Sequence, residues 1–265
     1  MKRYRLTPGK SVRLSEFDPA DTRLVRGGKD AAVKKSAAIL ERLIAQQELL
    51  YAGHQHKLLI VLQGMDTSGK DGAVTHVMGG FNPQGVRVVS YKRPSEVELD
   101  HDYLWRIHTQ VPGKGDIVIF NRSHYEDVLV VRVHNLIDEA ECARRYAQIN
   151  DFERMLSENG VTILKFFLHI SSDEQKKRLQ KRIDDPTRHW KFQHGDLAER
   201  KLWPQYQQAY EAALEQTSTK WAPWYLVPSD AKWYRNFVIG SVIADTLEGM
   251  KMKYPEIDLS KEVIE

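Results

Sequence analysis

One stretch decides the fold: KLLIVLQGMDTSGKDG, residues 57–72. It opens with an almost continuous apolar run, which is typical of a parallel strand buried on both faces. A Gly-rich turn follows, and a helix is predicted from about Lys70. Gly64, four intervening residues, Gly69 and Lys70 form the turn, a spacing that lets backbone N–H groups at a helix start face phosphate oxygens. The stretch therefore predicts an α/β fold with a phosphate-binding turn.

The turn departs from the usual pattern at two acidic positions. Asp71 stands where a Ser or Thr normally follows the lysine and holds a metal ion, and Asp66 lies inside the loop. A carboxylate there would repel phosphate unless a cation offsets it, so one interpretation is that Asp66 coordinates Mg²⁺ or orients an attacking phosphate oxygen. The alternative is an ordinary turn in which Asp66 interacts with the helix N-terminus. Lys70 is expected to act as a point charge on a transferring phosphoryl group.

Strands and helices alternate on both sides of this stretch. Further strands are expected at 86–91, 115–120, 161–170 and 224–229. Helices are expected at 29–52, 97–110, 138–158, 172–184, 196–217 and 232–252. This alternation favours a parallel sheet with helices on both faces. No linker divides the chain, so residues 1–265 are expected to form a single domain with an irregular basic arm at 1–27.

Composition excludes several classes of protein. Of the 265 residues, 42% are hydrophobic and 28% are charged, as in ordinary soluble domains. No apolar run approaches the ~18 residues of a membrane span, and the start lacks the apolar segment of a secretory signal. The single cysteine, Cys142, excludes a disulfide framework and a Cys-rich metal site. It favours a reducing compartment, so we expect a cytoplasmic protein.

Basic residues gather in two segments although the net charge is only +3. Residues 1–35 hold ten Lys and Arg against four acids, and a second basic cluster spans 176–191. Both indicate a polyanionic partner, although solvated helix faces would give the same pattern. Arg178 and Arg182 share one helix face. They suggest a basic lid, at about 172–200, that closes over a transferring group; an exposed amphipathic helix is the alternative.

A second polar loop, NRSHYED (121–127), follows the strand expected at 115–120. Ligands bind at the carboxyl ends of parallel strands, so this loop should lie beside the phosphate turn if the two strands are close. Arg122 would then clamp phosphate, and Glu126 or Asp127 would contact a metal or substrate. A surface loop with satisfied charges is the alternative.

Together these motifs resemble the polyphosphate kinase 2 family. The likeness covers about residues 30–250 and rests on GMDTSGKDG (64–72), RPSEVELDHDYLWRIH (93–108), GDIVIFNRSHYEDVLVVRVH (115–134), KFFLHIS (165–171), DDPTRHWKF (184–192), WPQYQQAYEAAL (203–214) and APWYLVPSDAKWYRN (222–236). The resemblance implies a P-loop kinase-like three-layer α/β/α fold with a parallel sheet and a helical lid. It also implies dependence on Mg²⁺, with Mn²⁺ as a substitute, and phosphoryl transfer between inorganic polyphosphate and nucleotides.

The resemblance implies a role for individual residues of both loops and of the lid. Catalytic roles fall to Asp66, Lys70, Arg122, Arg178 and Arg182, and which of the two lid arginines is catalytic stays open. Substrate or phosphate binding is implied for Gly64, Met65, Thr67, Ser68, Gly69, Asp71, Gly72, Arg93, Asn121 and Glu126. The metal is expected at Asp66 and Asp127.

The form of the second loop resembles one branch of the family, class III-like, that phosphorylates both AMP and ADP. Other branches carry Asp where this chain has Asn121, and Asn-Arg where it has Glu126 and Asp127. The implied partners are polyphosphate and adenine nucleotides, with other purines left open, and a second copy of the chain in a dimer or tetramer. Neither nucleic acid nor membrane is expected as a partner.

Two other functions stay open on the residues alone. One is an ATP-dependent kinase of small molecules or nucleoside monophosphates on the same core. The other is a non-catalytic nucleic-acid-binding protein, for which the chain shows no aromatic–basic RNA motif and no helix-turn-helix signature.

Overall fold

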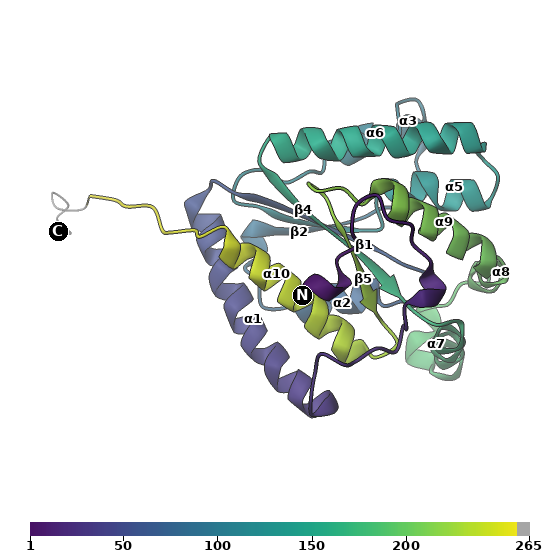
Figure 1. The fold of residues 1–265 in the computed structure, drawn as a ribbon, viewed down its shortest axis with the longest axis horizontal. Helices are drawn as coiled ribbons and strands as arrows, with labels where there is room; N and C mark the ends of the chain where they lie inside the picture. The colour runs from purple at the N-terminus through teal and green to yellow at the C-terminus, as the bar shows by residue number, and fades with distance from the viewer. Residues whose placement is uncertain (259–265) are drawn as a thin grey trace.

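The central feature of the molecule is a five-stranded parallel sheet (Figure 1). The computed structural model describes residues 1–258, and in them the strand order is β2-β3-β1-β4-β5. The strands are β1 (Lys57–Gln63), β2 (Val86–Ser90), β3 (Ile117–Asn121), β4 (Val161–His169) and β5 (Trp224–Pro228). Every neighbouring pair is parallel, so the predicted α/β class is confirmed.

The register of the central strands brings two polar loops side by side. Leu62 of β1 lies opposite Asn121 of β3 on one side and Phe166 of β4 on the other. The loops that follow β1 and β3 therefore leave the same edge of the sheet at neighbouring points. The proximity of these two strands, on which the prediction of a shared site depended, is confirmed.

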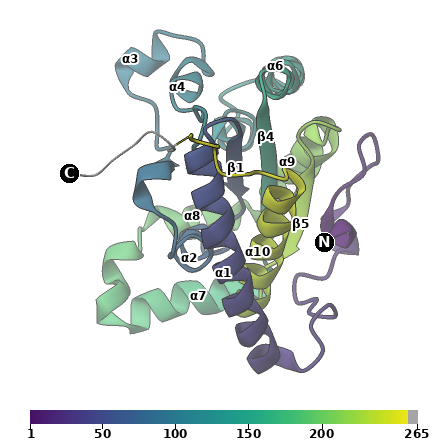
Figure 2. The same cartoon turned by 90° about the vertical axis from the view of Figure 1, so that its left-hand side faces the viewer.

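Helices cover both faces of the sheet (Figures 1 and 2). One face carries α1 (Gly28–Gly53), α2 (Lys70–Val77) and α10 (Lys232–Gly249), with α1 lying along α10. The other carries α5 (Val130–Val133), α6 (Glu139–Glu158) and α9 (Trp203–Thr217). The predicted three-layer α/β/α arrangement is confirmed.

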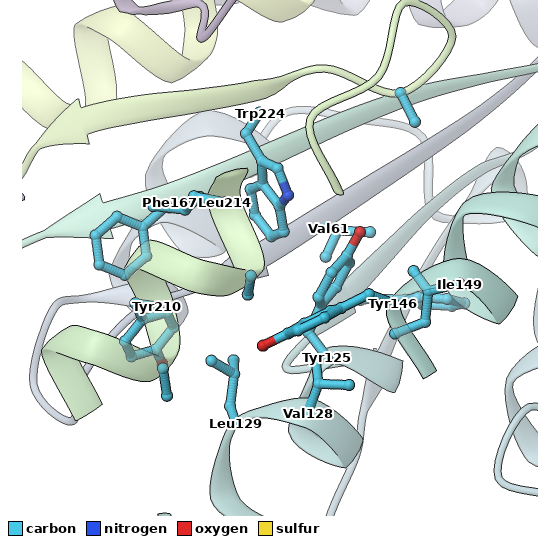
Figure 3. Packing of buried hydrophobic residues seen from close by; sticks show 14 of the residues in the cluster. Val61, Tyr125, Val128, Leu129, Tyr146, Ile149, Phe167, Tyr210, Leu214 and Trp224 are labelled. Carbon is cyan, nitrogen blue, oxygen red and sulfur yellow. The ribbon is translucent and has the colours of Figure 1, made fainter. Parts of the chain in front are cut away.

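Side chains of β1 point alternately into two apolar cores, one on each face of the sheet. Leu58, Ile60 and Leu62 belong to the core beneath α1 and α10, while Leu59 and Val61 belong to the core beneath α6 and α9. Burial on both faces explains why β1 has no polar residue between Lys57 at its start and Gln63 at its end. Figure 3 shows the second core, where the rings of Tyr125 and Trp224 meet edge to face with centroids 4.7 Å apart.

Two helices predicted from the sequence are each divided in the structure. The segment predicted at 97–110 forms α3 (Glu96–Leu99) and α4 (Trp105–His108), because Asp102 accepts a hydrogen bond from the Leu104 N–H and starts a new turn. The segment predicted at 196–217 forms α8 (Gly195–Lys201) and α9, because Pro204 stands in the first turn of α9 and cannot continue the preceding helix.

The segment after β4 projects from the body of the molecule (Figure 2). It consists of α7 (Ser172–Asp184), the 3-10 helix η5 (Pro186–Lys191) and α8. Ser171 starts α7 by accepting a hydrogen bond from the Glu174 N–H, and Pro186 follows its end. This segment corresponds to the expected lid. Shorter 3-10 helices are η1 (Lys2–Tyr4), η2 (Leu14–Glu16), η3 (Pro83–Gly85) and η4 (His124–Val128).

The N-terminal arm, predicted to be irregular, contains only η1 and η2 but is docked on the body. The Leu6 N–H donates to the Trp224 carbonyl of β5, and the Leu14 N–H donates to Glu211 of α9. Val12 is also buried. The arm therefore completes the second core along α9. No helix within residues 1–258 is both long and apolar enough to cross a membrane.

Candidate active site

The loop between β1 and α2 has an unusual backbone conformation. Its φ angles are positive at three residues: 151° at Gly64, 64° at Thr67 and 102° at Gly69. A Cβ at Gly64 would lie 2.8 Å from the Leu168 carbonyl oxygen. Glycine is therefore required there both by the backbone and by the close approach of β4, as the reading of a tight phosphate-binding turn predicted.

Arg178 of α7 supports this loop from behind. Its Nη1 donates to the carbonyls of Thr67 at 2.9 Å and Ser68 at 3.2 Å, while its Nη2 donates to the carbonyls of Ser229 and Asp230. Only 9% of the side chain is exposed. The structure thus places this expected lid arginine beneath the loop, where it fixes the backbone.

The loop amides face away from this support. Gln175 of α7 donates to the Asp66 carbonyl at 3.1 Å and is held in turn by Arg200. Because a trans peptide places a carbonyl and the following N–H on opposite sides, the N–H groups of Thr67 and Gly69 point away from α7. The loop therefore offers N–H groups to an anion on its outer side.

Lys70 lies across the mouth of the loop. Its Nζ donates to the carbonyls of Gly64 at 2.6 Å and Met65 at 3.4 Å. Burial lowers the pKa of Lys70, and the Asp66 carboxylate opposes that shift. The ammonium group lies within the turn beside the amides, as the interaction with a phosphoryl group requires.

The loop after β3 adds polar groups to the same place. Asn121 donates from Nδ2 to Asp71 at 2.7 Å and so joins the end of β3 to the first turn of α2. Arg122 has a positive φ of 62°, and its Nη2 lies 3.6 Å from the Asp66 carboxylate. Burial lowers the pKa of Arg122, but Glu126 and Asp66 outweigh it and leave that pKa raised. The exposed Arg122 guanidinium thus faces the mouth of the turn.

Glu126 lies between the two loops. Its Oε1 accepts a hydrogen bond from Gln63 at 3.1 Å, and Gln63 also donates to the Ser123 hydroxyl. Burial raises the pKa of Glu126, whereas Arg122 and Lys70 oppose that shift. Glu126 is therefore the carboxylate on which the charges of both Arg122 and Lys70 act.

The two carboxylates expected to hold a metal have different surroundings. Asp66 is 32% exposed at the mouth of the loop, and its only ion pair within residues 1–258 is the long one with Arg122. Asp127 is buried against Arg106 and Arg145, at 4.0 and 3.8 Å, rather than in the group around Asp66. Within residues 1–258 no three His, Cys, Asp or Glu side chains are grouped as a metal site. A hard cation that takes most of its ligands from phosphates and water fits Asp66, and Asp127 does not fit.

Two other arginines that were expected in the site lie away from the loop between β1 and α2. Arg182 donates from Nη1 to the Lys191 carbonyl and to Asp196, so it holds together the turn between α7 and α8. Arg93 is exposed after β2 and makes no hydrogen bond or ion pair with the described part of the chain. Among the expected cations, the structure therefore brings together Lys70 and Arg122.

A buried ion pair supports the second loop from within. Lys165 of β4 donates to Glu153 at 2.6 Å, to the Tyr125 hydroxyl at 2.7 Å and to the Thr217 carbonyl at 2.7 Å. Glu153 also contacts the His124 ring at 3.3 Å. Lys165 and Glu153 are fully buried. This network fixes η4, which carries Glu126.

Sequence reasoning missed three residues that hold the site. Gln63 and Gln175 had no motif of their own, although Gln63 ends an otherwise apolar strand and is thereby marked as polar at a ligand-binding edge. Arg235 of α10 packs against the loop, and its Nη1 donates to the Ser68 carbonyl at 3.2 Å. Arg235 lies in the stretch 222–236 that carries part of the family resemblance, but no role was assigned to it, because its contact with the turn depends on the packing of α10.

Comparisons with known proteins agree with this geometry. The model of the family described as polyphosphate kinase 2 matches residues 27–255. A protein of Meiothermus ruber named AMP/ADP-polyphosphate phosphotransferase is 55% identical over 264 residues, covering 100% of this chain and 99% of that protein. A protein of Rhodopseudomonas palustris named ADP-polyphosphate phosphotransferase is 43% identical, covering 96% of this chain and 92% of that protein.

The fold is also close to a solved structure. The crystal structure of polyphosphate kinase 2 from Arthrobacter aurescens superposes with a TM-score of 0.93 at 46% identity, covering 97% of this chain and 92% of that one. The similarity therefore extends over the sheet, both helical layers and the projecting segment.

Proposed function

Because this chain belongs to the polyphosphate kinase 2 family, we propose that it transfers the terminal phosphoryl group of inorganic polyphosphate to AMP and to ADP, giving ADP and ATP. The observation that carries the proposal is the convergence of the loop amides, Lys70 and Arg122 at one edge of the sheet. A site that combines backbone donors with two cations suits a reaction in which both substrates are polyanions.

The transfer needs positioning and charge neutralisation rather than an enzyme nucleophile. An oxygen of the nucleotide's terminal phosphate attacks the terminal phosphorus of the polymer in line, while the bond to the shortened polymer breaks. Lys70 and Arg122 would neutralise the oxygens of the transferring group, and the amides of Thr67 and Gly69 would orient it. The reverse transfer uses the same groups, so we propose that the reaction is reversible.

A divalent cation completes the proposal. We propose Mg²⁺, with Mn²⁺ as a substitute, held by Asp66 together with phosphate oxygens. Bound there, it would neutralise phosphate charge that Lys70 and Arg122 leave uncompensated. The exposed carboxylate of Asp66 at the mouth of the loop supports this assignment.

Further expectations complete the proposal. We propose a cytoplasmic, single-domain homo-oligomer, dimer or tetramer, in which the segment at about 172–200 acts as the lid. Light scattering on the purified protein checks the oligomeric state.

The deciding experiment omits ATP. Purified protein, Mg²⁺ and long-chain polyphosphate are incubated separately with AMP and with ADP, and nucleotides are followed by chromatography. ADP and then ATP should form from AMP, and Asp66→Asn should abolish both while its circular dichroism spectrum stays unchanged. This folded variant also excludes contaminating adenylate kinase as the source. ATP from ADP alone would reject AMP as a substrate. No product from either, with turnover of a small acceptor by ATP, would favour an ATP-dependent kinase.

A further inference from the structure

Arg235 is a buried cation beside the phosphate-binding loop, and it has no acidic partner in the part of the chain that the structure describes. Its side chain belongs to α10, and the residue is 2% exposed. Nη1 donates to the Ser68 carbonyl at 3.2 Å, while Nε and Nη2 donate to the neighbouring Asn236 amide oxygen. It makes no ion pair with any residue of the described chain. Burial, with a smaller effect of Arg178, lowers its pKa to about 10.

The glycines of the loop are matched to this guanidinium. A Cβ at Gly69 would lie 1.7 Å from the Arg235 Nη1, and one at Gly72 would lie 3.2 Å from its Nη2. Gly69 also has the positive φ that only glycine adopts easily. The absence of side chains at these two positions lets the guanidinium lie directly against the backbone of the turn.

A purely structural role does not explain the charge. Burying a cation without a counter-ion is costly, and an apolar side chain of similar size would normally pack there at lower cost. Arg178 already donates a hydrogen bond to the same Ser68 carbonyl. The hydrogen bond from Arg235 is therefore not needed to satisfy that carbonyl, and the main contribution of its guanidinium is positive charge. Unpaired buried charge next to a binding loop is typical of a functional site.

We propose that Arg235 is a positioning residue for the polyphosphate chain: it holds the Ser68 carbonyl behind the loop and lends its unpaired positive charge to the anion bound on the loop's other side. The inference rests on the proposed function. It explains how a loop that contains Asp66 and is followed by Asp71 in the first turn of α2 attracts a polyanion.

The test separates charge from packing with three variants. Arg235→Met removes the charge but keeps an unbranched chain, Arg235→Lys keeps the charge, and Arg42→Met removes an exposed arginine that pairs with Glu248 of α10. Binding of inorganic tripolyphosphate is measured by calorimetry, and KM is measured separately for polyphosphate and for AMP. We expect Arg235→Met to weaken tripolyphosphate binding and raise the polyphosphate KM by about tenfold or more. Arg235→Lys should recover most of this loss, and the AMP KM should stay within about twofold.

Several outcomes would overturn the inference. Equal tripolyphosphate affinities of Arg235→Met and Arg42→Met would show that the buried charge does not act on the anion. An equal rise in both KM values would indicate general distortion of the site. If Arg235→Met does not fold, the Arg235 Nε–H resonance of the wild-type protein decides: it should shift on titration with tripolyphosphate, and no shift at saturation refutes the proposal. Wild-type protein that does not use polyphosphate at all would instead refute the proposed function.

Discussion

Glu126 connects the loop after β3, to which it belongs, with the end of β1. It accepts a hydrogen bond from Gln63, and the charges of Arg122 and Lys70 act on its carboxylate. Each nucleotide acceptor presents a different number of charged phosphates to these cations, so the carboxylate that interacts with both should influence the choice of acceptor. The resemblance to the family pointed to the same position, because other branches carry a different residue where this chain has Glu126.

We therefore expect Glu126→Asn to change the ratio of kcat/KM for AMP to that for ADP by about fivefold or more. Glu126→Gln keeps the length of the side chain and the contact with Gln63, so it separates loss of charge from loss of shape. Steady-state kinetics with each nucleotide at saturating polyphosphate measure the ratio. An unchanged ratio in both variants would remove Glu126 from nucleotide selection.

Asp127 lies in surroundings different from those that its position in the loop suggested. Burial raises its pKa from 3.8 to about 6, although Arg106 and Arg145 oppose the shift. The folded protein therefore holds this proton more tightly than the unfolded chain does. The stabilisation that results is complete below pH ~4 and is lost as the pH rises through about 6.

Comparison with Asp127→Asn isolates this effect. The free energy of unfolding of the wild type, relative to that of the variant, should fall by about 2–3 kcal/mol between pH 4 and pH 7. Urea denaturation at several pH values measures it. A difference that does not vary with pH would mean that Asp127 is ionised throughout.

At the scale of elements, α7 acts as a support of the loop as well as the first part of the projecting segment. Arg178 and Gln175 together hold the carbonyls of Asp66, Thr67 and Ser68. The same helix faces α8 through Arg182 and Asp196. A movement of α7 would therefore be transmitted directly to the backbone of the turn.

Arg178→Gln should accordingly affect both stability and activity. Losing its bonds to four carbonyls should lower the free energy of unfolding by about 2–4 kcal/mol and kcat/KM by about tenfold or more. Arg182→Gln, on the outer part of the same helix face, is the matched variant and should cost less than about 1 kcal/mol. Urea denaturation and steady-state kinetics test both variants. If Arg178→Gln loses activity at full stability, Arg178 acts on the phosphates directly.

The length of the helices was less predictable than their presence. The ranges expected at 29–52, 138–158 and 232–252 agree closely with α1, α6 and α10. The sequence pattern did not show the breaks at Asp102 and Pro204, where a side-chain hydrogen bond and a missing N–H, respectively, end the helical backbone. Such local interruptions leave the average periodicity almost unchanged.

At the scale of the whole molecule, the Lys165–Glu153 pair joins β4, α6 and η4. Both side chains are fully buried and depend on each other for their charge. Lys165→Met should therefore destabilise the fold by about 3–5 kcal/mol, because it leaves a buried carboxylate unpaired. Adding Glu153→Leu to that variant should recover part of the loss. Urea unfolding at neutral pH measures both, and an unchanged stability of the single variant would contradict this account.

The sequence by itself determined the order of strands and helices, the parallel sheet and the tight Gly-rich turn that carries Asp66 and leads into Lys70. These depend on short-range patterns: an apolar run of strand length, glycines at fixed spacing and a helix start. Its prediction that the loops after β1 and β3 meet was confirmed because parallel strands end at one edge.

Only the tertiary structure decided which charged residues face that edge. Arg178 points beneath the loop, Asp127 points toward two arginines, and Arg235 contacts Ser68 of the turn across 167 residues of sequence. The physical reason is that a side chain's partners depend on packing between distant elements. A local sequence pattern shows that a residue can carry a charge, but it does not show which charge or carbonyl lies opposite.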